Sequence, residues 1–347
     1  MEILLPYKNV VTNQRNYTMD VLKAIFAICV ILVHFPFPGD IGTVFSTIGI
    51  TGVIFFFLNS GYHAYDIDDN KACKKIMGRF KRNLKITLIV LGIYLVLMTL
   101  EAVIGGYFDE YLGYYTNPWL VPRILLLGDF SFMKADQLWF MVALLYSYLI
   151  LFLLHKFKIA KYSYYALPIF LIFRIGVETY VNTAGADWHL TSFFLASGFP
   201  IMLLGHYLRA KKEAFLKAPL YVTIILTVIS ISLMYATVYV NVFDINCAQF
   251  FKIWTAFELF ILALKVPGSK EVPVIGVIGR KYSLYIYLFH FLIGIIIVDI
   301  FYIVGMPDWS FDFLLQILAI IFGVLGSIGL YKLNNLIKNK LKNRNHA

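Results

Sequence analysis

Charged residues are scarce in this sequence of 347 residues. Asp, Glu, Lys and Arg make up only 14% of the positions, whereas 60% are hydrophobic. A soluble globular domain carries roughly 25% charged residues and about 45–50% apolar ones. The composition therefore excludes a soluble enzyme, and its high hydrophobicity excludes an intrinsically disordered chain.

Cysteine is equally sparse. The three cysteines, Cys29, Cys73 and Cys247, are scattered along the chain, without a C-x-x-C pair or the spacing of a metal site. We therefore expect no disulfide, no thiol chemistry and no bound metal.

Long apolar runs are what the sequence does contain. They are continuous and about 20 residues long, as in membrane-spanning helices, and differ from the ~10-residue alternating segments of a transmembrane β-barrel. The sequence predicts an all-α polytopic membrane protein with about ten transmembrane helices. They fall at residues 20–37, 44–62, 86–106, 138–154, 164–181, 192–208, 220–239, 249–266, 282–304 and 311–333. Because several runs are short, nine or eleven helices are also compatible with the pattern.

Basic and acidic residues segregate between successive loops. With the N-terminus in the cytoplasm, the basic residues fall in the inner segments 71–85, 156–161, 209–217, 270–281 and 338–344. The outer segments hold Asp109, Glu110, Asp129, Asp136, Asp187, Asp244 and Asp308. Because cytoplasmic loops are enriched in Lys and Arg, we predict that both termini are cytoplasmic. The same bias accounts for the formal charge of +10 without a nucleic-acid partner.

The first predicted helix carries three ionisable residues, Asp20, Lys23 and His34. Such groups are costly inside a membrane and are functional candidates by default. Lys23 and His34 are eleven residues apart, so they share one helix face and lie about 16 Å apart along the axis. Asp20 lies on the same face as Lys23. We predict a functional role for His34, whereas Lys23 is equally compatible with a cation that reaches the interface from the helix end.

A basic face follows the second predicted helix. Lys75, Arg79 and Arg82 recur at helical spacing. The Arg79/Arg82 pair is a candidate phosphate site because guanidinium groups bind phosphate bidentately. The positive-inside bias alone also explains such a cluster.

Two further segments place polar residues inside apolar runs. The Asn-Ser-Gly sequence at residues 59–61 predicts a break in the second helix, which is tolerated at membrane depth only beside protein or a cavity. In the ninth predicted helix, Ser283, Tyr287 and His290 fall on one face.

Single polar or aromatic residues mark other helices. Glu258 and Arg174 lie in the eighth and fifth predicted helices and are candidates to pair with each other or with the groups above. Helix–helix hydrogen bonding is their more ordinary role. Trp139 sits at a predicted outer interface, where aromatic residues commonly gather.

The outer segment 107–137 is the longest loop. It is rich in tyrosine, with Tyr107, Tyr111, Tyr114 and Tyr115, and residues 120–127 predict a short interfacial helix. Long loops on a rigid scaffold often carry function.

These features, in this order, resemble the acyltransferase 3 family of membrane acyltransferases. Residues 20–23 with His34 resemble the family's Asp-x-Leu-Arg and histidine, although Lys23 replaces the usual Arg and lacks its planar fork. Further matches are residues 55–62 with Phe-Phe-x-x-Ser-Gly-Tyr, Arg79 and Arg82 with Arg-x-x-Arg, 138–140 with Leu-Trp-Phe, and 282–290 with Ser-Leu-Tyr-x-Tyr-Leu-x-His. The resemblance covers residues 15–335, the core of a single integral-membrane domain expected over 1–347 without a soluble domain.

The resemblance implies a multi-pass O-acyltransferase of a bacterial plasma membrane, surrounded by membrane lipid. It would move an acetyl or other short acyl group from cytoplasmic acyl-CoA, typically acetyl-CoA, to a hydroxyl of a cell-envelope glycan or related acceptor at the outer face. His34 would act as general base or as a nucleophile that carries the acyl group. The nucleotide end of the co-substrate would contact Lys23, Lys75, Arg79 and Arg82. Supporting roles fall to Asp20 beside Lys23, to Asn59 and Ser60 near the thioester carbonyl, and to Trp139, Glu258, Tyr287 and His290.

A transporter or flippase for a small polar molecule, such as an amino acid or glycan precursor, is the alternative. Broken helices and charges near the membrane midplane also suit substrate passage. A transporter has no need of the Arg79/Arg82 face, so tolerance of its loss distinguishes the two functions. The sequence leaves open the acyl chain, the oligomeric state and the acceptor, for which peptidoglycan, capsule, teichoic acid, lipid-linked sugar and a small secreted molecule are all compatible.

Overall fold

The computed structural model describes residues 15–239 and 247–344, and within them all regular secondary structure is helical. The α-helices are α1 (Tyr17–His34), α2 (Gly39–Ala64), α3 (Asp69–Gly105), α4 (Phe108–Tyr115), α5 (Leu120–Leu127), α6 (Trp139–Lys156), α7 (Leu167–Ala184), α8 (Gly198–Ala210), α9 (Lys212–Lys217), α10 (Leu220–Tyr239), α11 (Cys247–Lys265), α12 (Ile275–Val277), α13 (Ser283–Val304) and α14 (Leu315–Arg344). Single turns of 3₁₀- or π-helix are η1 (Ser131–Met133), η2 (Asp136–Leu138), η3 (Tyr162–Ala166), η4 (Trp188–Ser192), η5 (Ile278–Tyr282) and η6 (Ser310–Leu314). Asp244, one of the predicted outer acids, lies outside the described residues.

The predicted class, an all-α polytopic membrane protein, is confirmed. Nine helical segments of the described chain are long and apolar enough to cross a membrane. The sixth predicted span, 192–208, corresponds to α8, which has only 13 residues. At 1.5 Å per residue α8 is about 20 Å long, shorter than the ~30 Å hydrocarbon core. Its late start follows from Pro200, because proline is tolerated in the first helical turn and disrupts a helix interior.

Local sequence signals set the ends of the helices that build the site. The side chain of Asn16 accepts a hydrogen bond from the Met19 backbone N–H at 2.8 Å and caps α1. Pro36 then disfavours helical conformation in the preceding residue, and α1 ends at His34. Asp68 caps α3 in the same way. Because α3 begins at Asp69, the basic segment 71–85 is continuous with the third membrane helix.

Helix α2 lies at the centre of the bundle and packs against α1, α8 and α11. Its contact with α8 is close because glycines meet backbone. A Cβ on Gly61 would collide with the backbone of Met202, and a Cβ on Gly205 would collide with the carbonyl of Leu58. Small residues that let two backbones approach are the usual basis of helix association in membranes.

The predicted break at residues 59–61 is wrong, since α2 continues without interruption to Ala64. The hydroxyl of Ser60 donates to the carbonyl of Phe56 at 2.8 Å, four residues earlier, which satisfies its polarity within the helix. Gly61 serves the contact with α8. A short polar sequence therefore marks a helix–helix crossing here, and the backbone stays helical.

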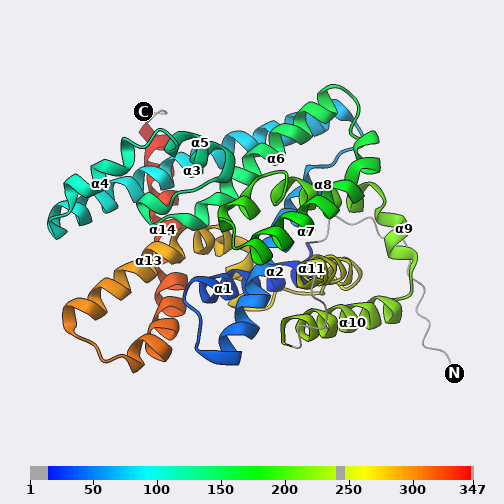
Figure 1. Ribbon diagram of the computed structural model, residues 1–347. Helices are drawn as coiled ribbons and strands as arrows, with labels where there is room; N and C mark the ends of the chain where they lie inside the picture. The colour runs from blue at the N-terminus through cyan, green and yellow to red at the C-terminus, as the bar shows by residue number, and fades with distance from the viewer. Residues whose placement is uncertain (1–14, 240–246, 345–347) are drawn as a thin grey trace.

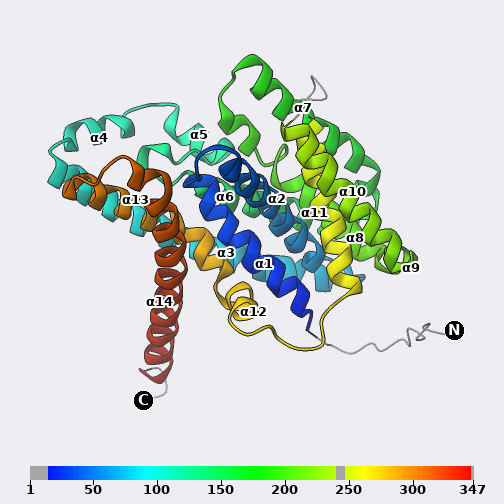
Figure 2. The ribbon, with the colours of Figure 1, turned by 90° about the horizontal axis from the view of Figure 1, so that it is seen from below.

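The bundle has a centre and two flanks. Helices α1 and α2 lie side by side through the middle, with α10 and α11 on one flank and α13 and α14 on the other (Figures 1 and 2). The end of α14 extends beyond the other helices (Figure 2). Peripheral helices expose large apolar side chains, such as Leu88 and Val96 of α3 and Ile225 of α10. These faces are suited to lipid, because lipid tails are as apolar as the side chains.

Candidate active site

A pocket of about 180 Å³, called here the basic pocket, lies between α1, α2, α3, α6 and the beginning of α13. Four cationic side chains line it: Lys23, Arg79, Arg82 and Arg280. Its uncharged polar lining is Asn59, Ser60, Asn83, Tyr148, Ser283 and Tyr287. No acidic side chain lines it in the part of the chain that the structure describes. The structure thus brings together residues that the sequence nominated on four separate helices.

Helix α3 supplies the basic wall of this pocket. Arg79, Arg82 and Asn83 are three or four residues apart, so they share one face of the helix. Asn83 is buried at 4% exposure, whereas Arg82 is exposed. Neither Arg79 nor Arg82 forms an ion pair within the described ranges. Two guanidinium groups are therefore directed to one cavity without an acidic partner.

Helix α1 contributes Lys23, whose ammonium lies 3.9 Å from the Asp20 carboxylate. Asp20 is buried, and its shorter contact, 2.7 Å, is to the Nε of Arg15. The expected Asp20–Lys23 pair is present, but Arg15 is the stronger partner of the acid. Gly279 packs against the backbone carbonyl of Asp20, and a Cβ at residue 279 would collide with it. This close approach brings the η5 turn, and with it Arg280, to the pocket.

Asn59 and Ser60 line the pocket from α2. The hydroxyl of Ser60 already bonds its own helix. The side-chain oxygen of Asn59 is buried and has no hydrogen-bond partner among the described residues. A buried polar atom without a partner is costly, so Asn59 is the better candidate to contact a bound molecule.

The predicted histidine lies beyond the pocket, at the end of α1. Tyr287, which lines the pocket, donates to the backbone carbonyl of Gln137 at 2.6 Å. One turn further along α13, the His290 ring lies 6.1 Å from the Tyr287 ring and 5.2 Å from the His34 ring, measured between centroids. His34 and Lys23 lie on one uninterrupted helix, about 16 Å apart along its axis. The basic pocket and the histidine pair thus occupy different depths of the bundle.

The hydrogen bonds of His290 define its tautomer. Its Nδ1 lies 2.9 Å from the backbone carbonyls of Ile286 and Tyr287, so Nδ1 carries the proton. Its Nε2 is buried and has no partner within the residues that the structure covers. An acceptor nitrogen is therefore available next to His34.

Lys75 does not line the pocket. It is exposed, and its ammonium lies 3.2 Å from Asp66 and 3.0 Å from the carbonyl of Tyr65. The Asp68 backbone N–H and the Lys75 ammonium hold the pKa of Asp66 below its ordinary value. The role of Lys75 in co-substrate binding stays a prediction, and it is not supported by a position in the cavity.

Three other sequence candidates lie away from the basic pocket. Trp139 packs its ring 6.1 Å from that of Phe57. Glu258 accepts a hydrogen bond from Trp254 at 3.1 Å within α11. The suggested pairing of Glu258 with Arg174 is wrong, because the guanidinium of Arg174 donates to the Ala196 carbonyl at 2.8 Å. Arg174 thus bonds a neighbouring segment, the ordinary role of a polar residue between helices, whereas the contact of Glu258 stays within its own helix.

Sequence reasoning missed four residues of this region. Asn83, Tyr148 and Arg280 line the basic pocket, and Arg15 holds Asp20. Asn83 had a signal, since it is four residues after Arg79 on the same helix face. Arg280 also had a sequence signal, because it lies three residues before Ser283. Sequence reasoning explained it only by the enrichment of basic residues in cytoplasmic loops. Tyr148 had no such signal, because its position depends on packing between distant segments. Arg15 lies only five residues before Asp20, but it precedes α1, so the helix period assigns it no face.

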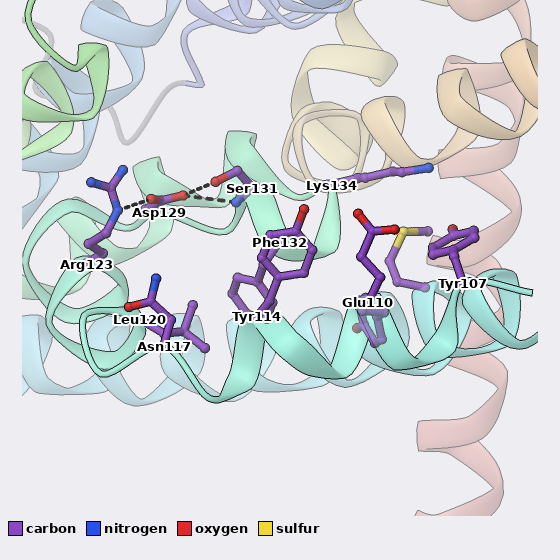
Figure 3. Close-up of a pocket in the computed structure, with 12 residues that line it drawn as sticks. Tyr107, Glu110, Tyr114, Asn117, Leu120, Arg123, Asp129, Ser131, Phe132 and Lys134 are labelled. Carbon is purple, nitrogen blue, oxygen red and sulfur yellow. Dashed lines mark hydrogen bonds and ion pairs between the residues drawn. The ribbon is translucent and has the colours of Figure 1, made fainter.

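The tyrosine-rich segment 107–137 forms a second pocket, of about 410 Å³. Helix α5 coincides with the short helix predicted at 120–127. Figure 3 shows Tyr107 just before α4, and Glu110 and Tyr114 within it, facing residues 129–134. Arg123 and Lys134 add positive charge, and Asp129 adds negative charge. The pocket combines aromatic and charged groups, as expected for a polar ligand.

Fold and basic pocket together define a polytopic membrane protein with a site suited to an anionic ligand. Comparison with protein families narrows the class. The model of the acyltransferase 3 family, described as an acyltransferase domain, matches residues 16–332. The chain therefore belongs to this family of membrane acyltransferases, and the resemblance seen in the sequence is confirmed. No curated protein and no solved structure matches the chain.

Proposed function

We propose that the protein is a membrane O-acyltransferase that uses cytoplasmic acyl-CoA and acylates a hydroxyl of a cell-envelope glycan or related acceptor at the outer face. The observation that carries this proposal is the basic pocket, with its four cations and no acidic lining residue. Coenzyme A is strongly anionic at its nucleotide end and nearly neutral along its pantetheine arm. With the basic loops in the cytoplasm, the pocket faces the compartment that supplies acyl-CoA.

The electrostatics of the pocket favour phosphate. Lys23 shares Asp20 with Arg15, and Arg280 lies 3.0 Å from Glu271, so these two cations are partly neutralised. Arg79 and Arg82 are not. Two unit charges 4 Å apart attract by about 4 kcal/mol at an effective dielectric constant near 20. The arginine pair is therefore the main anchor for the nucleotide phosphates in this proposal.

The size of the pocket fits part of the co-substrate. Ligand pockets for drug-sized molecules enclose roughly 300–1,000 Å³, more than the 180 Å³ found here. We place a phosphate-bearing portion in the pocket and the narrow pantetheine arm along α1, past Tyr287 and toward His34. The ~16 Å between Lys23 and His34 suits a long donor that is held at one end and reacts at the other.

His34 carries the chemistry in this proposal. As a general base it takes the proton of the acceptor hydroxyl, the hydroxyl oxygen attacks the thioester carbonyl, and the C–S bond breaks to release the thiolate of CoA, which is then protonated. As a nucleophile it first takes the acyl group and then passes it to the acceptor. The two routes differ in one observable, because only the second releases CoA in a burst without acceptor.

Acyl transfer into sealed vesicles tests the proposal. Inverted membrane vesicles from cells that produce the protein are supplied with radiolabelled acetyl-CoA, and label retained in the luminal glycan is counted. Wild type should incorporate label, and His34→Ala should lose about 10²–10⁴-fold of the rate. Lys81→Ala, at an exposed position outside the basic pocket, should match wild type. Equal incorporation by His34→Ala and wild type would contradict the proposal.

The transporter alternative loses part of its support. It rested partly on a broken helix at residues 59–61, and α2 is continuous there. The matched family is one of acyltransferases. A variant without the Arg79/Arg82 pair still distinguishes the two functions, since transport would survive its loss.

A further inference from the structure

A cluster of acidic residues and one histidine adjoins the pocket of Figure 3. Nitrogen and oxygen atoms of Asp129, Asp136 and His189 lie within 4.8 Å of one another. Asp129 follows α5, Asp136 begins η2, and His189 belongs to η4. The tertiary fold thus brings together three residues from separate turns. His189 is buried, with 7% exposure.

The two nitrogens of His189 have different partners. Its Nδ1 lies 2.7 Å from a carboxylate oxygen of Asp187, so Nδ1 donates its proton there. Its Nε2 is directed toward Oδ1 of Asp129 at 3.2 Å and Oδ1 of Asp136 at 3.8 Å. Within the described residues, Nε2 makes no well-aligned hydrogen bond, and neither does Oδ1 of Asp136. A buried imidazole nitrogen thus faces two carboxylate oxygens without a well-aligned hydrogen bond to either.

This arrangement is common around protein-bound metals. A histidine ligand usually donates its second N–H to a carboxylate, which fixes the tautomer and aims the other nitrogen at the ion. Asp187 occupies that position for His189. The orientation of Nε2 is therefore set before any ion binds.

Asp129 is also held in place. Its Oδ2 accepts from the Nε of Arg123 at 2.6 Å, and its Oδ1 accepts from the backbone N–H of Ser131 at 3.1 Å (Figure 3). Arg123 also reaches Asp187 at 2.7 Å. Its guanidinium is one positive charge against the three carboxylates of Asp129, Asp136 and Asp187. With a neutral imidazole at His189, an excess of two negative charges remains, the charge that a divalent cation neutralises.

We propose that Asp129, Asp136 and His189 bind one divalent metal ion, and that Zn²⁺ fits the set best. Zinc takes imidazole nitrogen and carboxylate oxygen at about 2.0–2.2 Å. The imidazole makes Mg²⁺ and Ca²⁺, which prefer oxygen ligands, poorer candidates. Three protein ligands leave a fourth position open, and the cluster adjoins the tyrosine-rich pocket because Asp129 also lines it. The ion would tie segment 107–137 to the η4 turn.

Metal binding to the purified full-length chain tests this proposal. The protein, with any affinity tag removed, is treated with EDTA, exchanged into metal-free detergent buffer and titrated with Zn²⁺ by calorimetry. We expect one Zn²⁺ per chain. Asp136→Asn and His189→Asn should weaken binding at least about 100-fold, and Asp187→Asn about 10–100-fold, as for other partners of metal-binding histidines. Glu110→Gln, which alters the same pocket outside the cluster, should bind like wild type.

Two further readouts keep the outcome clear if a variant folds poorly. Co²⁺ in place of Zn²⁺ should give visible absorption bands with wild type and Glu110→Gln, and Asp136→Asn should lose them. The melting temperature of wild type should fall in EDTA and recover with Zn²⁺. Absence of Zn²⁺ binding by folded wild type would overturn the proposal, and so would binding that survives in both Asp136→Asn and His189→Asn.

Discussion

The rings of His34 and His290 lie 5.2 Å apart, one at the end of α1 and the other in the middle of α13. Two segments from opposite ends of the sequence thus place two imidazoles side by side. The proton of His290 is held on Nδ1 by backbone carbonyls. In the described chain, the ring of His34 forms no hydrogen bond, which leaves its nitrogens available to an acceptor hydroxyl.

His290 should act by positioning what reaches His34. We expect His290→Ala to lower kcat for acyl transfer about 10–100-fold, with KM for acyl-CoA nearly unchanged, because the basic pocket does not include this residue. Steady-state kinetics with acetyl-CoA as the varied substrate checks this. A raised KM with unaltered kcat would assign His290 to donor binding instead.

Arg79 should determine the affinity for the acyl-CoA donor. A hydrogen bond to a charged group contributes about 1.5–3 kcal/mol, so Arg79→Ala should raise KM for acyl-CoA roughly 10–150-fold. Lys81→Ala removes the same charge from the same helix at an exposed position outside the pocket and should change KM little. Equal effects of the two substitutions would mean that general surface charge, rather than the pocket, attracts the donor.

Donor binding should weaken with salt. The Debye length falls from about 10 Å at 0.1 M ionic strength to about 3 Å at 1 M, and Arg82 is exposed at the pocket. We therefore expect KM for acyl-CoA to rise with salt in wild type, and less steeply in Arg79→Ala/Arg82→Ala. Kinetics between 0.05 and about 0.5 M salt measures both slopes, and parallel slopes would contradict a phosphate-binding role.

The crossing of α2 and α8 should tolerate no side chain at Gly61. A Cβ there meets the Met202 backbone, and overpacking costs typically about 1–3 kcal/mol. Gly61→Val should therefore lower the melting temperature measured in detergent. Gly78→Ala is the control, because a Cβ at Gly78 on α3 meets no atom within 4 Å and alanine favours the helix. A melting temperature of Gly61→Val equal to that of Gly78→Ala would disprove the close packing.

A buried network that sequence reasoning did not detect should matter for stability. The His155 ring lies 2.6 Å from Asp69 and 2.8 Å from His206, which in turn bonds the Tyr164 hydroxyl at 2.9 Å. Both histidines are at most 2% exposed. His206→Ala should cost about 1–3 kcal/mol by leaving buried polar groups unpaired. Thermal unfolding beside His63→Ala checks this, and equal melting temperatures would show that the network contributes little.

Helical spacing predicted much of the site. Arg79 and Arg82 share one face of α3, and Lys23 and His34 share one face of α1. Ser283 and Tyr287 of α13 line the same pocket. Each of these relationships depends only on the helix period. The tyrosine-rich loop and its short helix were predicted for similarly local reasons. The sequence does not define the number of full-length spans, since hydropathy does not separate a buried 13-residue helix such as α8 from a span.

Contacts between distant segments were not predictable in this way. Tyr287 bonds the backbone of Gln137, 150 residues away. Arg15 is only five residues from Asp20 but lies outside α1, and it is a closer partner of this acid than Lys23, which helical spacing does not predict. The polar residues at 59–61 have two structural explanations, a break or a close helix crossing, and only the position of α8 decides between them. Glu258 and Arg174 do not pair with each other, because Glu258 bonds Trp254 and Arg174 bonds the Ala196 carbonyl.

Binding of acetyl-CoA to the purified protein tests the central claim, that the basic pocket holds the acyl donor. Calorimetry in nanodiscs compares wild type with Arg79→Ala/Arg82→Ala, with the charge-matched control Lys81→Ala/Lys85→Ala, and with His34→Ala. The account predicts that wild type, the lysine control and His34→Ala bind acetyl-CoA, and that the double-arginine variant does not. A folded wild type that fails to bind, or a double-arginine variant that binds as wild type does, would contradict it.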